Sequence, residues 1–391
     1  MALKHLLTPF SGFLLACLVA FSLQIYFSPI SPDPLHLPPP SHLPQNNILQ
    51  KVIKLGDGVL LEPEDVDVDK DGTIYTATRD GWIKRLHKNG SWENWKKVNT
   101  DTVLGITFTK DGDLVACDTD QGLLKITEAG VTVLTSHVNG SKISKTAEKE
   151  RKKEEENERG GRSKNYGVGI GVGGGGIGVG GGDDVIEGPD GSLYFSVAST
   201  KFGLHDWYLD VLEAKPHGQL LKYDPSSRET SVLLDHLGFA NGVAVSKDQD
   251  YLVVCETWKC LRHWLEGKNK GKTEIFVENL PGGPDNINLA PDGSFWIALL
   301  RLTREGFEFV HTSKAAKHLV AASRKLTELV SGMRTEAMAV NVAADGKIIK
   351  KLMDPDGSVI SFVTNALEFE DHLYLGSLNA NFIGKLPLKD A

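Results

Sequence analysis

Residues 282–299, GGPDNINLAPDGSFWIAL, contain the pattern that decides the fold. Two polar residues, Asp285 and Asn286, stand directly before a short apolar run, and a Pro-Asp-Gly turn at 291–293 leads into a second run of β-forming residues. An Asp-Gly pair between two β-forming runs is a strong signal for a hairpin. We therefore expect a short strand, a tight turn and a returning strand here.

The same pattern recurs along the chain. Polar residues before a strand, a turn that often contains Asp-Gly, and a returning strand are found at 64–75, 105–115, 183–195 and 241–254. A hairpin that repeats at intervals of tens of residues indicates a radial or stacked β architecture. Folds of this kind add units around one core, so a chain of 391 residues does not need several domains.

The charge and cysteine content exclude two classes of protein. The chain has 43 Lys and Arg against 51 Asp and Glu, a net charge of −8, and therefore no electrostatic footprint for nucleic acid. Cys17 lies in an apolar run, which leaves Cys117, Cys255 and Cys260, too few for a disulfide framework. A Cys255–Cys260 bridge is an option in an oxidising compartment, but we expect two separate buried thiols.

The N-terminus is predicted to be a signal anchor over residues 1–27. Residues 6–27 are mostly apolar and uncharged, close to the roughly 20 residues that span a bilayer. A cleaved signal peptide would have a shorter apolar region and a small-x-small site, which 24–27 lacks. We expect a single-pass protein on the lumenal side of the endoplasmic reticulum, or in the vacuole. Secretion after cleavage and a buried core helix are the alternatives.

Composition separates the remaining segments. The Pro-rich residues 28–47 are expected to be an extended, solvated spacer before a globular domain at 48–391. Asn89 and Asn139 begin N-x-S sequons in turn-like sequence and are expected glycosylation sites. Residues 142–182 combine a dense mixed-charge run with a glycine-rich run, so we expect a disordered insert. A phosphate-binding loop is not favoured, because no Lys-Ser/Thr follows the glycines.

One amphipathic helix is predicted late in the chain, over 313–333. Small and apolar residues recur there at helical spacing: Ala315, Leu319, Ala322, Leu326, Leu329 and Val330. We expect this face to pack on the β domain. A helix lying on a membrane is the alternative, but the face contains no aromatic residue.

Polar residues stand at equivalent places, each just before the first strand of a unit: Glu64, Asp183, Asn241, Asp285 and Asn286. In a radial fold the first strands converge on the axis, so these side chains would meet there. Carboxylate and amide oxygens suit Ca²⁺, whereas zinc would call for Cys or His. Without a metal, the adjacent carboxylates would raise each other's pKa. Ordinary turn residues are the alternative interpretation at any single position.

The repeats resemble the strictosidine synthase-like proteins of plants, which are similar to adipocyte plasma membrane-associated protein and, distantly, to paraoxonases and gluconolactonases. The phrases that carry the resemblance are 62–66, 183–187, 238–243, 256–257, 262–265, 280–287 and 373–378. It covers about 48–388 apart from 142–182. The resemblance implies a six-bladed β-propeller and agrees with a signal anchor.

The resemblance also implies site residues. The calcium ligands of paraoxonases and gluconolactonases correspond to Glu64, Asp183, Asn241 and the pair at 285–286, with Asp183 where paraoxonases have Asn. The paraoxonase histidine pair corresponds to Leu104 and Asp118, so that pair is missing.

The catalytic glutamate of true strictosidine synthases, in the last blade, corresponds to Asn365 or Thr364, neither of which can act as a base. Glu368 is close in sequence, but strand alternation makes it a doubtful substitute.

Three functions remain open. The first is a Ca²⁺-supported hydrolase of esterase or lactonase type acting on a small-molecule substrate, with the metal as Lewis acid. The second is a strictosidine synthase-type lyase that condenses an amine with an aldehyde. The third is a non-enzymatic, membrane-tethered lumenal propeller that binds a partner.

Overall fold

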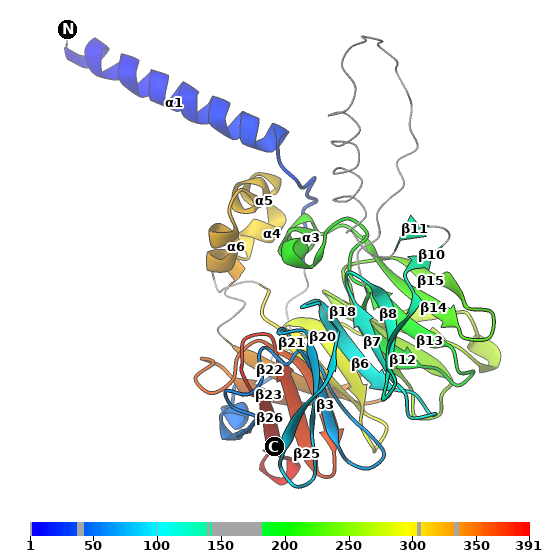
Figure 1. Cartoon of the computed structure of the whole chain (residues 1–391). Coiled ribbons are helices and arrows are strands. Elements are labelled where there is room, and N and C mark those ends of the chain that lie inside the picture. The colour runs from blue at the N-terminus through cyan, green and yellow to red at the C-terminus, as the bar shows by residue number, and fades with distance from the viewer. Residues whose placement is uncertain are drawn as a thin grey trace, which may run out of the picture.

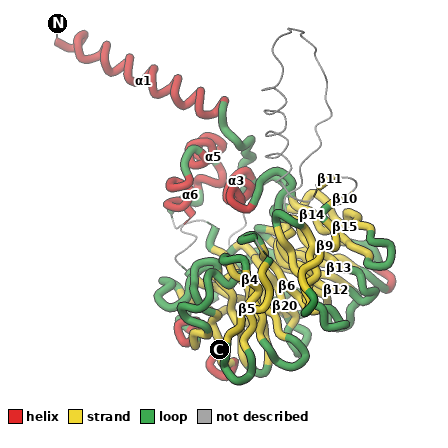
Figure 2. Tube along the Cα trace, in the orientation of Figure 1, coloured by secondary structure: helices red, strands yellow, loops and turns green. Residues whose placement is uncertain are grey.

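The computed structural model describes residues 2–36, 43–98, 100–138, 141–142, 182–302, 306–331 and 336–391. Six four-stranded antiparallel sheets are arranged around a common axis, and a group of helices lies at one end (Figure 1). This confirms the predicted all-β, six-bladed propeller. Figure 2 shows how sharply the strands of the blades are separated from the helices.

Each blade runs from an inner strand to an outer strand, and in blades 1 to 5 the order along the chain is the order within the sheet. Blades 1 to 3 are β2 (Val66–Val68), β3 (Ile74–Thr78), β4 (Trp82–Leu86), β5 (Trp92–Lys97); β6 (Val103–Phe108), β7 (Leu114–Asp118), β8 (Gly122–Thr127), β9 (Gly130–Thr135); and β12 (Gly182–Glu187), β13 (Leu193–Val197), β14 (Gly218–Asp224), β15 (Glu229–Leu237). Blades 4 to 6 are β16 (Ala240–Val245), β17 (Tyr251–Glu256), β18 (Lys259–Trp264), β19 (Thr273–Val277); β20 (Gly283–Leu289), β21 (Phe295–Leu300), β22 (Ala337–Val342), β23 (Ile348–Asp354); and β24 (Val363–Phe369), β25 (His372–Ser377), β26 (Ile383–Pro387), β1 (Ile53–Leu55). A two-stranded ribbon, β10 (His137–Val138) and β11 (Ser141–Lys142), projects beside blade 3.

The propeller closes because the start of the globular domain supplies the outer strand of the last blade. β1 pairs antiparallel with β26, with Ile53 opposite Lys385 and Leu55 opposite Ile383. The two ends of the domain are therefore joined by strand pairing, and no blade is left incomplete. The short 3₁₀ helix η1 (Ile48–Lys51) precedes this strand and buries Leu49.

Strand β24 begins only at Val363, because the Asp354 carboxylate accepts hydrogen bonds from the amides of Val359 and Ile360 and holds that segment in a loop. One prediction about the β units needs correction. The two separate thiols expected at Cys255 and Cys260 form a disulfide. These residues face each other across the β17–β18 hairpin, a register that their five-residue spacing did not reveal.

The inner strands are irregular at the same place in most blades. In blades 2 to 6 the pairing with the second strand shifts register at the first two or three residues of the inner strand. Such a bulge changes the direction of the side chains that it contains. Four of the five predicted ligand positions, Asp183, Asn241, Asp285 and Asn286, fall at these bulges, whereas Glu64 precedes β2, whose pairing with β3 is regular.

Glycine permits the closest approach between inner strands. A Cβ added to Gly105 would lie 2.6 Å from Asp184 Cα, and one added to Gly242 would lie 2.6 Å from the Asp285 carbonyl oxygen. Both contacts are with backbone atoms of the next blade, which cannot move independently of their sheet. A side chain at either position would therefore push two blades apart.

The helices form a separate layer at the end of the propeller where the inner strands begin (Figure 1). They are α1 (Ala2–Tyr26), η2 (Leu204–Asp206), α3 (Trp207–Glu213), α4 (Phe309–Thr312), α5 (Lys314–Ala321) and α6 (Arg324–Ser331); a 3₁₀ turn in blade 4, η3 (Gly267–Asn269), and one at the end of the chain, η4 (Leu388–Asp390), lie apart from this layer. The single amphipathic helix predicted at 313–333 is thus two short helices.

The predicted buried face of this segment is wrong. Leu319, Leu326 and Leu329 are exposed, whereas Val320 and Lys317 are buried. Val320 packs in a cluster with Leu209 and Leu212 of α3, so the segment contacts other helices through a face that the periodicity did not indicate.

The N-terminal segments are also held differently from the prediction. Ile30 is buried, the Asp33 amide donates to the Glu213 carbonyl, and the Leu35 amide donates to the His311 carbonyl. The described parts of 28–47 are thus docked and do not form a solvated spacer. Within the described residues, no helix has the length and hydropathy needed to cross a membrane. The insert, except at its two end residues, and Asn139 lie outside the described residues.

Replacing Gly105 with alanine is expected to destabilise the propeller. The added methyl would overlap backbone of blade 3, and overpacking of this kind typically costs about 1–3 kcal/mol of unfolding free energy. Urea denaturation of Gly105→Ala measures this loss. The matched control is Gly12→Ala in α1, where an added Cβ meets nothing within 4 Å and no loss is expected. Equal stability of Gly105→Ala and the parent would contradict the close packing of blades 2 and 3.

Candidate metal and ligand site on the propeller axis

The five predicted site residues come together where the inner strands begin. Glu64 precedes β2, Asp183 lies in β12, Asn241 in β16, and Asp285 and Asn286 in β20. They come from blades 1, 3, 4 and 5, and their positions within these blades are equivalent. Each occupies one of the two positions before the first regularly paired residue of its inner strand.

Direct contacts hold this cluster together. The Asn286 side-chain amide donates a hydrogen bond to Glu64 Oε1 at 3.0 Å. The Asn241 side chain is hydrogen-bonded to Asp285 and lowers its pKa, which burial and the charges of Glu64 and Asp183 raise more strongly. Residues separated by up to 222 positions in sequence are therefore neighbours.

Three oxygens of the cluster are buried without a hydrogen-bond partner among the residues that the structure describes. They are Glu64 Oε2, Asp183 Oδ2 and Asn241 Oδ1. Asp183 as a whole is half-buried, but this oxygen is inaccessible to solvent. A buried acceptor without a partner is costly, so three in one place indicate a site built for a cation or for donors of a ligand.

Electrostatics support the same interpretation. Burial, and then the Asp183 charge, raises the pKa of Glu64 to about 8. Burial raises the pKa of Asp183 to about 7, although the Arg79 guanidinium opposes the shift. Neighbouring carboxylates add to the raised pKa values of Glu64 and Asp285, although burial is the larger cause. When ionised, the cluster would hold more negative charge than the nearby Arg79 guanidinium compensates.

A second layer of polar residues lies directly after the first, and the sequence analysis did not predict it. The Asp65 carboxylate accepts from the amides of Val66 and Ile106, and the Asp184 carboxylate accepts from those of Val185 and Val243, all at 2.7–2.8 Å. Each aspartate thus ties its own inner strand to that of the next blade. The sequence feature that could have predicted this layer is the pair of consecutive acidic residues at 64–65 and at 183–184.

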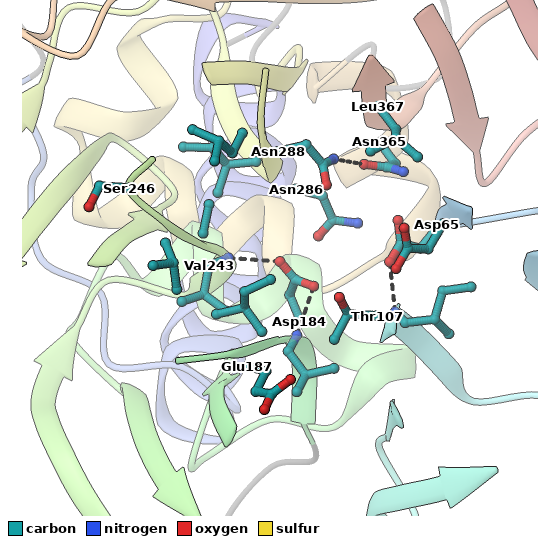
Figure 3. Close-up of a pocket in the computed structure, with 18 of the residues that line it drawn as sticks. Asp65, Thr107, Asp184, Glu187, Val243, Ser246, Asn286, Asn288, Asn365 and Leu367 are labelled. Carbon is teal, nitrogen blue, oxygen red and sulfur yellow. Dashed lines mark hydrogen bonds between the residues drawn. The ribbon is translucent and has the colours of Figure 1, made fainter. Parts of the chain in front are cut away.

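A cavity of about 270 Å³ continues along the axis from this second layer (Figure 3). Asp65, Asp184, Asn286 and Asn365 line it, and it extends to the turn after β16. Figure 3 shows Asp184 bridging to Val243 and Asn288 bridging to Asn365 at its wall. Asn286 belongs both to the cavity and to the cluster around Glu64, so the two are adjacent.

Aromatic residues lie at the start of the inner strands, near the helices. The Trp207 ring lies 6.2 Å from the Phe239 ring and 6.5 Å from the Phe362 ring, measured between centroids. Phe239 and Phe362 each stand two residues before the first polar position of blades 4 and 6. The three rings therefore form an aromatic wall between the helical layer and the start of the inner strands of blades 4 and 6.

Comparison with known proteins identifies the family. The family model for strictosidine synthase matches residues 183–268, and the model for the N-terminal part of strictosidine synthase-like proteins matches 42–86. The chain is 31% identical to strictosidine synthase-like protein 4 of Arabidopsis thaliana over 91% of this chain and 86% of that protein. The chain belongs to the strictosidine synthase-like family. It is also 29% identical to bovine adipocyte plasma membrane-associated protein, over 94% of this chain and 86% of that protein.

Solved structures share the fold of this strictosidine synthase-like chain. A gluconolactonase from Xanthomonas campestris aligns with a TM-score of 0.54 and 14% identity over 92% of this chain and 96% of that one. A luciferin-regenerating enzyme aligns with a TM-score of 0.51 and 12% identity over 85% and 94%. At these identities the likeness concerns the propeller alone.

Family positions outside the cluster are occupied by structural residues in this strictosidine synthase-like chain. Leu104 is buried, and the buried Asp118 carboxylate accepts from the amides of Asp120 and Gln121. The Thr364 hydroxyl donates to the Glu64 carbonyl, and the Asn365 amide donates to the Val66 carbonyl. These groups link backbone segments, and none of the four is placed as a free base.

Glu368 is turned away from the axis. Its Oε2 accepts a hydrogen bond from the Trp296 indole at 2.7 Å, between blades 5 and 6. Leu367, the preceding residue, lines the cavity instead. Strand alternation therefore directs the Glu368 carboxylate between blades.

The donor set fits a hard cation better than a soft one. Among the described residues, no group of three or more His, Cys, Asp or Glu side chains is arranged to hold a metal ion. The candidate site also contains amide oxygens, because the side chains of Asn241 and Asn286 lie among the carboxylates. The three partnerless oxygens include one of these amides, and all-oxygen sets of this kind suit Ca²⁺.

Without added divalent cations, the unfolding free energy should fall as pH rises from about 4.5 to about 8. The folded pKa values of Glu64 and Asp183, about 8 and 7, exceed the usual values of 4.5 and 3.8, so the native state binds more protons than the unfolded state in this range. The slope of unfolding free energy against pH is then negative. Urea denaturation in a chelating buffer, repeated for the parent and for Glu64→Gln, measures it. The slope should be shallower in Glu64→Gln, and equal slopes would contradict the assignment.

Proposed function

We propose that this protein is a calcium-supported hydrolase of the esterase or lactonase type. One observation carries the proposal: the buried oxygens of Glu64, Asp183 and Asn241 that have no hydrogen-bond partner among the described residues come from three different blades and meet at the axis. Asp285 and Asn286 complete the proposed ligand set. The raised carboxylate pKa values agree with a site that gains stability from a bound cation.

The proposed chemistry divides between the ligand and the chain. Bound Ca²⁺ would polarise the substrate carbonyl and stabilise the developing oxyanion, the Lewis-acid role. Asn286 holds the Glu64 carboxylate in place through its hydrogen bond, and Asn241 holds Asp285 in the same way. The aromatic wall of Trp207, Phe239 and Phe362 would orient the apolar part of an ester or lactone.

The comparisons support this choice without establishing it. The Xanthomonas structure is described as a gluconolactonase, and it shares the propeller over most of both chains. The lyase alternative is less well supported, because Thr364 and Asn365 offer no carboxylate and Glu368 binds Trp296. A binding-only propeller remains the alternative if no turnover is found.

The test is turnover of aryl esters and lactones by the purified protein in calcium. Asn241→Ala removes one proposed ligand and should lower kcat/KM by at least about tenfold, with a matching loss of calcium affinity. A chelator should abolish the parent activity, and added calcium should restore it and raise Tm.

Two variants make this test specific. Asn241→Asp keeps an oxygen donor and should retain calcium binding, whereas Asn94→Ala makes the same deletion on the exposed face of β5 and should behave as the parent. Activity that resists both the chelator and Asn241→Ala would exclude a calcium-supported reaction at this cluster.

We also propose that the chain is attached to a membrane through residues 1–27, with the propeller in a lumenal compartment. Exposed apolar side chains are concentrated in α1, including Phe13, Leu14 and Leu18. The Cys255–Cys260 disulfide supports an oxidising environment. The similar bovine protein is named as plasma membrane-associated.

Topology can be tested through Asn89, which is exposed in the turn between β4 and β5. In eukaryotic cells the full chain should carry an N-glycan that endoglycosidase removes and Asn89→Gln lacks. It should also stay in the membrane fraction after carbonate extraction. Deletion of residues 1–27 should abolish both properties, and a deletion variant that is still glycosylated and membrane-bound would contradict the proposed anchor.

A further inference from the structure

The helices inserted in blade 5, α4 to α6, present an apolar surface that nothing in the described chain covers. Phe309, Leu319, Leu326 and Leu329 have 58%, 50%, 38% and 52% of their surface exposed. Ile275 and Ile349, two other exposed large apolar residues of the propeller, stand on separate blades. An exposed apolar cluster on neighbouring helices is typical of an interaction surface.

These helices are fixed in orientation by their other face. Lys317 is fully buried, and its ammonium group donates to the Asp33 carbonyl at 2.6 Å. Val310 and Val320 pack with Leu209 of α3, and the His311 ring lies edge-on to Trp258, with 5.5 Å between centroids. The exposed leucines therefore point away from the propeller in a defined direction.

The surface is next to the N-terminal helix. The Gln24 side-chain amide donates to the His318 carbonyl at 2.9 Å, and α1 packs against α5. Figure 1 shows α1 leaving the body of the molecule directly beside α5. The exposed apolar residues of α1 and of α4–α6 thus lie on adjoining elements, although nearly 300 residues separate them in sequence.

The charge of this surface is opposite to that of the chain. Residues 309–331 contain four basic residues and one acidic residue, a net charge of +3, whereas the whole chain has −8. Of the four, Lys314, Arg324 and Lys325 are exposed; Lys314 pairs with Asp33 and Arg324 with Glu328, both at 3.2 Å, so Lys325 is the cation beside the leucines for which the described residues show no partner. Exposed leucines bordered by cations match the interface of an anionic bilayer, which takes up apolar side chains and attracts basic ones.

We propose that α4–α6 dock on the surface of an anionic lipid bilayer, as a second contact beside α1. The contact is peripheral: the side chains of Leu319, Leu326 and Leu329 enter the interfacial region and Lys325 meets lipid headgroups. A second copy of the chain is the competing occupant. It is disfavoured because two such surfaces would bring like charges together. Docking would hold the propeller in one orientation relative to the membrane.

The experiment places an environment-sensitive fluorophore on single cysteines in the full chain. The background is Cys17→Ser, because Cys17 is exposed while Cys117 is buried and unreactive. Leu326→Cys carries the label at the proposed contact, and Ile275→Cys, at a site similarly exposed on β19, is the matched control. On vesicles of neutral and anionic phospholipid the label at 326 should shift to the blue, and the label at 275 should not.

Charge reversal separates lipid binding from other causes. The double variant Arg324→Glu with Lys325→Glu should lower the partition constant of the 326 contact on anionic vesicles by about fivefold per charge. A label at Leu18→Cys reports attachment of α1 independently. If 18 enters the bilayer while 326 stays in water, the proposed docking is wrong and the anchor stands. A blue shift at 326 that appears without vesicles and grows with protein concentration would mean that a second copy covers the surface, and would also overturn the proposal.

Discussion

Hydrogen bonds from buried aspartates to the next blade are the constraint on which the rest of this propeller depends. Asp65 and Asp184 each receive one amide of their own strand and one of the following blade. Burying a carboxylate is costly unless it is hydrogen-bonded, and these backbone donors offset much of that cost. Because the donors belong to different sheets, the inner strands are held in register around the axis, and Glu64 and Asp183 are brought next to them.

The bulge at the start of the inner strands explains how one short segment serves two purposes. Two consecutive polar residues, such as Asp183 and Asp184, can both be used near the axis because the regular alternation is interrupted there. The first residue joins the candidate cation site, and the second joins blades. Where a neighbouring strand must come closest, Gly105 or Gly242 replaces the second residue.

The helical layer has a different character from the propeller. The blades bury their apolar residues between sheets, with Cys255, Phe295 and Val340 in one continuous cluster across blades 4 and 5. The helices bury a smaller apolar cluster around Leu209 and Val320, add polar contacts such as that of Lys317, and leave other apolar residues on the surface. Trp207 connects the two parts, because it begins α3 and its ring lies beside Phe239 and Phe362. The candidate site is therefore bounded by the propeller on one side and by the helical layer on the other.

Much of this could be predicted from local pattern. Polar residues before each strand and Asp-Gly turns are short-range signals, so the sequence by itself determined the hairpin units, a radial β architecture and the five residues from Glu64 to Asn286 that meet at the axis. The number of blades followed only from the resemblance to strictosidine synthase-like proteins. Only the tertiary structure decided that Cys255 pairs with Cys260, that β1 completes the last blade and that Leu319 and Leu326 face outward. The physical reason is that these features depend on which surfaces meet after the blades have assembled. Periodicity along a segment indicates that one face is apolar, but not what that face will contact.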